Sequence, residues 1–231
     1  MTNTTLDCSD LDQHMGKAMA PARMKEPLHN NDFRRWVQAM HYPNLLHYDR
    51  DFAAEGRYGR LVAPQSFAVA TDDGHGAVPA CVGKIPESHL IFGGDEWWFY
   101  GPRIFAGDMI TNEKVPFDYA VKETKFAGPT CFQRGDNNYY NQNGDFIAKQ
   151  RSTTIRYSAA LALEMGAMSE NSEEPEWTPE QLDDLEVQKY DYIRMMHELG
   201  HGKRYWDDIN VGTELPLRVI GPHSIASFTT E

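Results

Sequence analysis

The chain has 231 residues, of which 41% are hydrophobic and 12% aromatic, enough for one large packed domain or for one domain plus part of another. The chain has no apolar run of about 18 residues and no signal-like N-terminus, so no membrane span or secretory leader is expected. Three widely spaced cysteines, Cys8, Cys81 and Cys131, argue against a disulfide framework and favour a reducing, cytoplasmic compartment.

The net charge of −12 argues against nucleic acid as a partner. Much of that charge lies in residues 163–186, which hold seven Glu and two Asp and no Lys or Arg. The remainder is nearly balanced, so a local basic patch for a phosphate-bearing ligand stays compatible with the composition.

The first regular element expected is a helix that begins at Asn30 or Asn31, either of which can cap it. Apolar residues follow at helical spacing, namely Phe33, Trp36, Val37 and Met40. Pro43 then ends the helix. An irregular stretch over 41–49 leads to a short helical piece over 51–55, which Gly56 and Gly59 stop.

An apolar segment rich in Ala and Gly, 67–82, predicts a second helix that is buried or wrapped by other elements. Four antiparallel strands are then expected, over 90–100, 109–124, 129–140 and 146–157. The last two are joined by a hairpin turn at 141–145, where Asn143-Gly144 accepts a positive φ. A sheet of this size needs one face covered, and the helix over 67–82 is the natural cover. The fold class predicted is α+β.

The sequence predicts four segments: a domain over 1–160, an acidic linker over 161–179, a linker helix over 180–203 and a closing segment over 204–231. Thr178 and Pro179 form a start signal for the linker helix. The closing segment loosely resembles the opening of the chain in the order of its Gly, Pro-His and Phe residues. We expect it to begin a second copy of the same unit, which stops where its first helix should start.

A resemblance to a known family lies in residues 26–64, 93–102, 132–157 and 204–212. These stretches are similar to the MaoC-like acyl dehydratases and R-specific enoyl-CoA hydratases. Residues 26–64 resemble their first half, and 93–102 with Gly107-Asp108 resemble a strand and its exit in double-hot-dog members. Residues 132–157 resemble their closing hairpin, and 204–212 the start of the second unit. The resemblance implies a hot-dog fold, in which an antiparallel sheet wraps a central helix, with this chain carrying the N-terminal unit of a pair.

The catalytic motif of that family is D-x-N-P-[IL]-H, whose Asp and His handle water and the α-proton of an enoyl thioester. Here the matching stretch runs from Tyr42 to His47. Asn44 and His47 agree with the motif, whereas Tyr42 replaces the Asp and Leu45 replaces the Pro. A Tyr, with an ordinary pKa near 10, is a poor carboxylate substitute, so the acid/base pair is broken in this copy.

By this resemblance His47 and Tyr42 are the catalytic candidates, and Asn44, Gln65 and Ser66 are the substrate-binding candidates. Gln65 and Ser66 begin the expected central helix, where family members use backbone N–H groups to hold the enolate oxygen. Four arginines are candidates for contact with the phosphates of CoA: Arg57, Arg60, Arg151 and Arg156. Surface solubility explains each of them equally well.

The function expected is the non-catalytic half of an enoyl-CoA hydratase or acyl dehydratase, which binds an acyl-CoA or enoyl-CoA thioester without cofactor or metal. It would form a homodimer, or a heteromer with a catalytic hot-dog subunit. The alternative is an autonomous homodimeric thioester-binding protein or thioesterase. In the simplest reading, His47 is an ordinary loop histidine.

Two further patterns have structural explanations. His197-Glu198-Leu199-Gly200-His201 matches H-E-x-x-H, the zinc-protease motif, but the helix ends at once and no third ligand follows, so a polar helix end is favoured. The aromatic run 97–100 alternates across a strand. We expect its inward pair to pack in the core and its outward pair to serve a subunit interface.

Overall fold

The computed structural model describes residues 6–71, 76–166, 176–202 and 205–223. The chain divides into two compact units, Met1–Leu28 with Gln65–Glu173 and His29–Pro64 with Glu174–Glu231. The first unit contains the sheet, and the second contains the helices around the predicted motif. The predicted domain boundaries group the chain differently and stay predictions.

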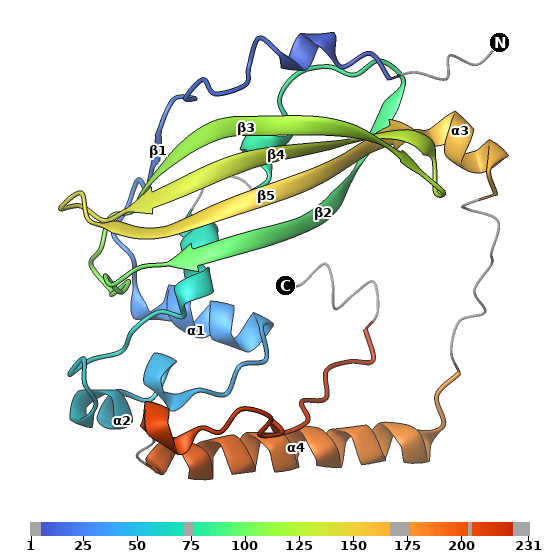
Figure 1. The fold of residues 1–231 in the computed structure, drawn as a ribbon. Helices are drawn as coiled ribbons and strands as arrows, with labels where there is room; N and C mark the ends of the chain where they lie inside the picture. The colour runs from blue at the N-terminus through green and yellow to red at the C-terminus, as the bar shows by residue number, and fades with distance from the viewer. Residues whose placement is uncertain (1–5, 72–75, 167–175, 203–204, 224–231) are drawn as a thin grey trace. The chain divides into compact units, whose positions relative to one another are not determined.

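A curled antiparallel sheet of five strands forms the first unit, in the order β1-β3-β4-β5-β2 (Figure 1). The four predicted strands are all present, each within two residues of its expected ends. The short β1, which pairs with the start of β3, was not predicted. The bounds are β1 Ala22–Arg23, β2 Ser88–Phe99, β3 Thr111–Thr124, β4 Gly128–Tyr140 and β5 Phe146–Ser158.

The turn between β4 and β5 confirms the prediction at 141–145. The Asn141 side-chain oxygen accepts hydrogen bonds from the backbone N–H groups of Asn143, at 2.9 Å, and Asp145, at 3.0 Å. Gly144 has φ +82°, a conformation that side chains with a Cβ rarely adopt. Turn chemistry therefore sets the register of the two central strands.

The segment expected as one buried helix over 67–82 differs in the structure. Its described residues form two 3-10 helices, η3 (Gln65–Thr71) and η4 (Val78–Ala80), in place of a continuous α-helix. Gly76 and Pro79 disfavour α-helix, because glycine is too flexible and proline lacks the N–H donor. The predicted role as cover is retained, since η4 packs on β3, β4 and β5.

The second unit contains α1 (Asn30–Ala39), η2 (Leu45–His47), α2 (Arg50–Glu55) and α4 (Pro179–His201). Thr178 caps α4 as predicted, through a hydrogen bond that its hydroxyl accepts from the Gln181 N–H. The cap of α1 is His29, where the sequence predicted Asn30 or Asn31. The Asp32 carboxylate accepts a 2.8 Å hydrogen bond from the His29 N–H and completes a capping box, which places the helix start one residue earlier.

The remaining elements are short. A helix that was not predicted, α3 (Ala159–Glu164), follows β5 and is capped by Ser158, while 167–175 of the predicted acidic linker lie outside the described residues. Residues 205–223 contain the single 3-10 turn η5 (Trp206–Asp208) and no strand. The second hot-dog unit stays a prediction. Within the described part of the chain, no helix is long and apolar enough to cross a bilayer.

Candidate functional site

The predicted motif lies in the second unit, where the chain leaves α1 and turns through η2. The Asn44 side chain caps η2, because its oxygen accepts a hydrogen bond from the Leu46 N–H at 3.0 Å. Its nitrogen donates to the Tyr42 hydroxyl at 3.3 Å. The Asn44 amide is therefore engaged locally at both ends, and its predicted contact with substrate stays a prediction.

His47 is buried and oriented by the backbone. Its Nδ1 lies 2.6 Å from the Val62 carbonyl oxygen, so Nδ1 carries the proton and donates, and Nε2 carries the lone pair. Burial lowers the pKa of His47, and the hydrogen bond to Val62 opposes that shift only in part. The imidazole is thus neutral near pH 7, the state that a general base requires.

Tyr42 is the neighbour of His47 at the position where the family motif has a carboxylate. The two rings are tilted by 37° with their centroids 5.6 Å apart. Among the described residues, the side-chain hydrogen bond of His47 is to a backbone carbonyl and not to a carboxylate. The structure therefore brings the predicted residues Tyr42, Asn44 and His47 together, but it pairs the histidine with a phenol.

Gln65 and Ser66 open η3 and are half-buried. They belong to the first unit, whereas Tyr42, Asn44 and His47 belong to the second. Their predicted role in substrate binding stays a prediction.

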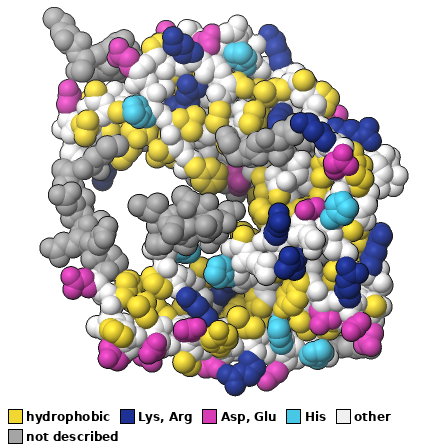
Figure 2. All heavy atoms as spheres, turned by 180° about the vertical axis from the view of Figure 1, so that it is seen from behind, with side chains coloured by type: hydrophobic (Ala, Val, Ile, Leu, Met, Phe, Trp, Pro, Cys, Tyr) yellow, Lys and Arg dark blue, Asp and Glu magenta, His cyan; other side chains and the backbone are white. Residues whose placement is uncertain are grey.

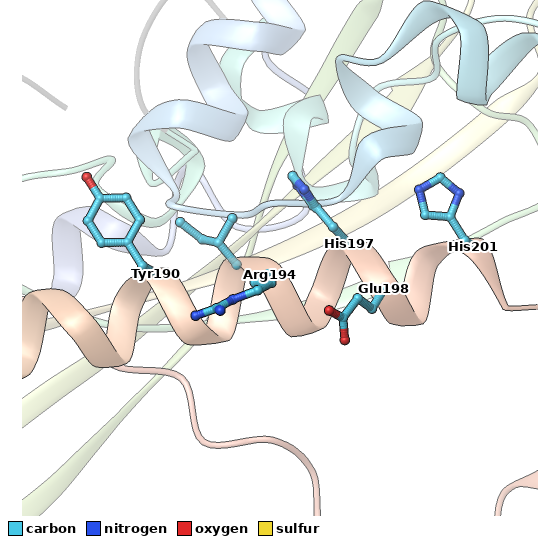
Figure 3. Close-up of a pocket in the computed structure, with 6 residues that line it drawn as sticks. Tyr190, Arg194, His197, Glu198 and His201 are labelled. Carbon is cyan, nitrogen blue, oxygen red and sulfur yellow. The ribbon is translucent and has the colours of Figure 1, made fainter.

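The two histidines of the H-E-x-x-H match have neighbours within their own unit. His197 Nε2 lies 2.6 Å from the Tyr48 hydroxyl, and His201 packs edge-on against Phe52 with ring centroids 5.5 Å apart. Figure 3 shows both histidines on one side of α4 and Glu198 on the other. In the described part of the chain, no group of three His, Cys, Asp or Glu side chains is placed to hold a metal. A shallow groove of about 550 Å³ runs along this helix, lined by Tyr190, Ile193, Arg194, His197, Glu198 and His201.

A second pocket, of about 390 Å³, lies within the first unit and was not foreseen from the sequence. One wall comes from the η3–η4 segment and the other from β2 and β5. The sequence signal for it was the alternation of Gln, Ser and Thr along β5, which by itself does not say which face of the sheet is covered. Its lining residues are Val69, Gly76, Ala77, Cys81, Leu90, Phe92, Asp95, Gln150, Ser152 and Thr154.

Two of the four candidate CoA-binding arginines have partners inside the sheet unit. Arg151 donates two hydrogen bonds to Asp136, at 2.6 and 2.9 Å, and Arg156 donates to the Gly83 carbonyl at 3.0 Å. Burial by itself raises the pKa of Asp136, but the hydrogen bonds from Arg151 and Lys149 outweigh it and hold that pKa low. Arg151 and Arg156 therefore stabilise the sheet.

The aromatic run divides between the two faces of β2, as predicted. Trp97 stacks on Phe99, with centroids 5.5 Å apart, and on Tyr139, at 5.9 Å. Phe99 is nevertheless 41% exposed, as Trp98 is, so the predicted core packing of the inward pair does not hold for Phe99. The predicted place of Trp98 in a subunit interface stays a prediction.

The curled sheet with its covering helical segment defines a hot-dog domain of the dehydratase and hydratase type. The family model described as "FAS1-like, dehydratase domain region" matches residues 13–150, more than half of the chain, so the chain belongs to this family. This confirms the predicted fold and the predicted resemblance to MaoC-like dehydratases.

Solved structures are similar to this chain at low identity. The ChsH1–ChsH2 complex from Mycobacterium tuberculosis is 14% identical, with 65% of this chain and 90% of that chain covered and a TM-score of 0.53. The R-hydratase PhaJ1 from Pseudomonas aeruginosa is 16% identical, with 71% and 91% covered and a TM-score of 0.44. At 14% identity, the similarity to the ChsH1–ChsH2 complex shows the fold alone. No curated protein matches the chain.

Proposed function

We propose that this chain binds an acyl thioester and is the non-catalytic half, or a non-catalytic subunit, of an enoyl-CoA hydratase or acyl dehydratase. The observation that carries the proposal is the Tyr42 phenol beside the buried, neutral His47, where the family motif supplies a carboxylate. Hydration of an enoyl thioester needs one group to take a proton from water and another to deliver a proton to the α-carbon. His47 can serve one of these roles, but the Tyr42 phenol is a poor replacement for the carboxylate as a base, because it holds its proton more tightly than a carboxyl group does.

The proposed partner is a hot-dog subunit with an intact motif, and the proposed contact is the free edge of β2. This strand has 12 residues, ends the order of the described sheet and exposes apolar side chains along its length. A long apolar edge strand is a template for pairing with another chain. The similar ChsH1–ChsH2 structure is itself a complex of two chains.

The test separates binding from turnover in the purified chain. Calorimetry with saturated octanoyl-CoA measures binding, and loss of the conjugated-thioester absorbance of octenoyl-CoA measures hydration. We expect binding without hydration, and His47→Ala leaves the binding unchanged. Addition of a hot-dog subunit with an intact D-x-N-P-x-H motif is expected to produce hydration.

The alternative is an autonomous homodimeric thioester-binding protein or thioesterase, and His47 is the observation that favours it. Its Nε2 lone pair is available to activate water, because Nδ1 is held by Val62. Turnover by the chain alone, either hydration or CoA release, that disappears in His47→Ala would establish this alternative and overturn the non-catalytic assignment.

A further inference from the structure

The face of β5 that packs under the η3–η4 segment is unusually polar for a covered sheet face. Its side chains alternate with those of the outer face, and all five are buried. Covered faces of antiparallel sheets are ordinarily apolar, because a buried polar group needs a hydrogen-bond partner. The five are Ala148, Gln150, Ser152, Thr154 and Arg156. All of them except Ala148 have side chains that can form hydrogen bonds.

Most of these polar groups have partners within the unit. The Gln150 oxygen accepts hydrogen bonds from the Tyr139 hydroxyl at 3.0 Å and from the Asn137 amide at 3.2 Å. Its nitrogen donates to the Asp95 carboxylate at 2.7 Å. The Thr154 hydroxyl donates to the Ala80 carbonyl at 2.5 Å. The network fixes the positions of these side chains without any ligand.

Ser152 differs from the others, because the one polar atom of its side chain has no partner among the described residues, whereas Arg156 lacks a partner at Nε but donates from Nη1. Ser152 has no exposed surface, and among the described residues its hydroxyl oxygen has no hydrogen-bond partner. A buried hydroxyl without a partner costs stability, and an alanine at this position would avoid that cost. The same Ser152 lines the 390 Å³ pocket, so a molecule in the pocket can reach it.

The other residues that line the pocket indicate which chemical groups a bound molecule carries. Val69, Leu90 and Phe92 supply apolar surface, and Asp95 supplies a carboxylate that already accepts one hydrogen bond from Gln150. Asp95 can accept a further hydrogen bond but cannot donate one, whereas Ser152 can do both. A hydroxyl group fits this pair, because it can donate to Asp95 and bond with Ser152. A terminal carboxylate would be repelled by the Asp95 charge.

We infer that the pocket between the η3–η4 segment and β2–β5 binds an acyl chain that carries a hydroxyl group on one of its last four carbons, apart from the 3-hydroxyl that hydration itself forms, and that Ser152 and Asp95 select it over the plain alkyl chain. The inference rests on the proposed acyl-thioester binding and specifies its substrate class. The apolar wall holds the hydrocarbon part, and the two polar side chains bind the hydroxyl.

The test compares octanoyl-CoA with isomers that carry one hydroxyl on each of the last four carbons, by calorimetry on the full chain. We expect one isomer to bind more tightly than octanoyl-CoA by about fivefold, the gain of one well-placed hydrogen bond. Ser152→Ala removes this preference and leaves the affinity for octanoyl-CoA and the thermal midpoint at or above wild-type values, because the deleted hydroxyl has no partner in the described part of the chain. Thr153→Ala, one residue along on the opposite face of β5, is the matched control and keeps the preference.

Asp95→Asn is the second variant, in which the side chain keeps its shape and can still accept the bond from Gln150. This variant should bind the preferred hydroxylated isomer more weakly than wild type does, and should bind an acyl-CoA with a terminal carboxyl group more tightly. If octanoyl-CoA binds but no hydroxylated isomer binds more tightly, a water molecule satisfies Ser152 and the inference is wrong while the proposed function stands. If no acyl-CoA binds at all, the proposed function fails with it.

Discussion

At the scale of single residues, the environment of His47 decides both its protonation and its contribution to stability. Burial lowers its pKa in the folded chain, and the Val62 carbonyl holds the proton on Nδ1. In the unfolded chain the imidazole returns to a pKa of about 6.5. The unfolded state therefore takes up a proton at a higher pH than the folded state does, so this group stabilises the fold above the unfolded pKa and loses that effect as pH falls.

We expect the free energy of unfolding to decrease between about pH 7.5 and pH 5, with a His47 contribution of at most about 1.4 kcal/mol per pH unit. His47→Gln should flatten this dependence, because glutamine does not titrate. Urea denaturation at several pH values measures it, and His223→Gln, at an exposed histidine, is the control. Equal slopes in wild type and His47→Gln would show that the buried histidine does not contribute.

At the scale of elements, one glycine determines how closely the covering segment approaches the sheet. Gly135 lies in the middle of β4, opposite Ser152 of β5. A Cβ built on Gly135 would collide with the carbonyl carbon of Pro79 and the backbone nitrogen of Ala80 in η4. These are backbone atoms, which cannot move away as the end of a side chain can. The pocket beside η4 depends on the same close approach.

Gly135→Ala is therefore expected to destabilise the fold by about 1–3 kcal/mol, the usual cost of overpacking a core. It should also weaken acyl-CoA binding, since η4 has to shift away from the sheet. Thermal unfolding and calorimetry measure the two effects. Gly101→Ala, where an added Cβ meets no atom within 4 Å, is the matched control and should change neither.

At the scale of the whole molecule, a substantial amount of apolar side chain is exposed. Exposed hydrophobic residues occur along β2, along α4 and in 205–220, and Figure 2 shows hydrophobic side chains reaching the surface among charges of both signs. Extensive exposed apolar surface marks contact sites for other chains. Among these surfaces, β2 is also an edge strand of the described sheet.

Ile91→Lys in β2 is expected to prevent pairing of this chain with itself or with a catalytic subunit. Ile91 is 41% exposed and pairs with Ile155, so a lysine can reach solvent without burial in the monomer. Light scattering after size exclusion measures the mass, with Val121→Lys, 46% exposed on β3, as the control. A dimer that persists in Ile91→Lys but not in Val121→Lys would move the interface from β2 to the β3 surface.

The sequence by itself determined the four long strands, the turn at 141–145, α4 with its Thr178 cap and the family of the domain. These features depend on local rules: alternation along a strand, a positive φ at Gly144, and cap residues at a helix end. The replacement of an Asp by Tyr42 was equally readable, because the motif is contiguous in the chain.

Only the tertiary structure decided the rest. Gln150, Ser152 and Thr154 alternate with Lys149, Arg151 and Thr153, so both faces of β5 are polar and the pattern cannot show which one is covered. The packing of η4 against Gly135 and the burial of His47 against Val62 join residues separated in sequence. Local propensity does not specify such contacts. They follow from how the chain fills space, and they place the buried Ser152 hydroxyl in a pocket.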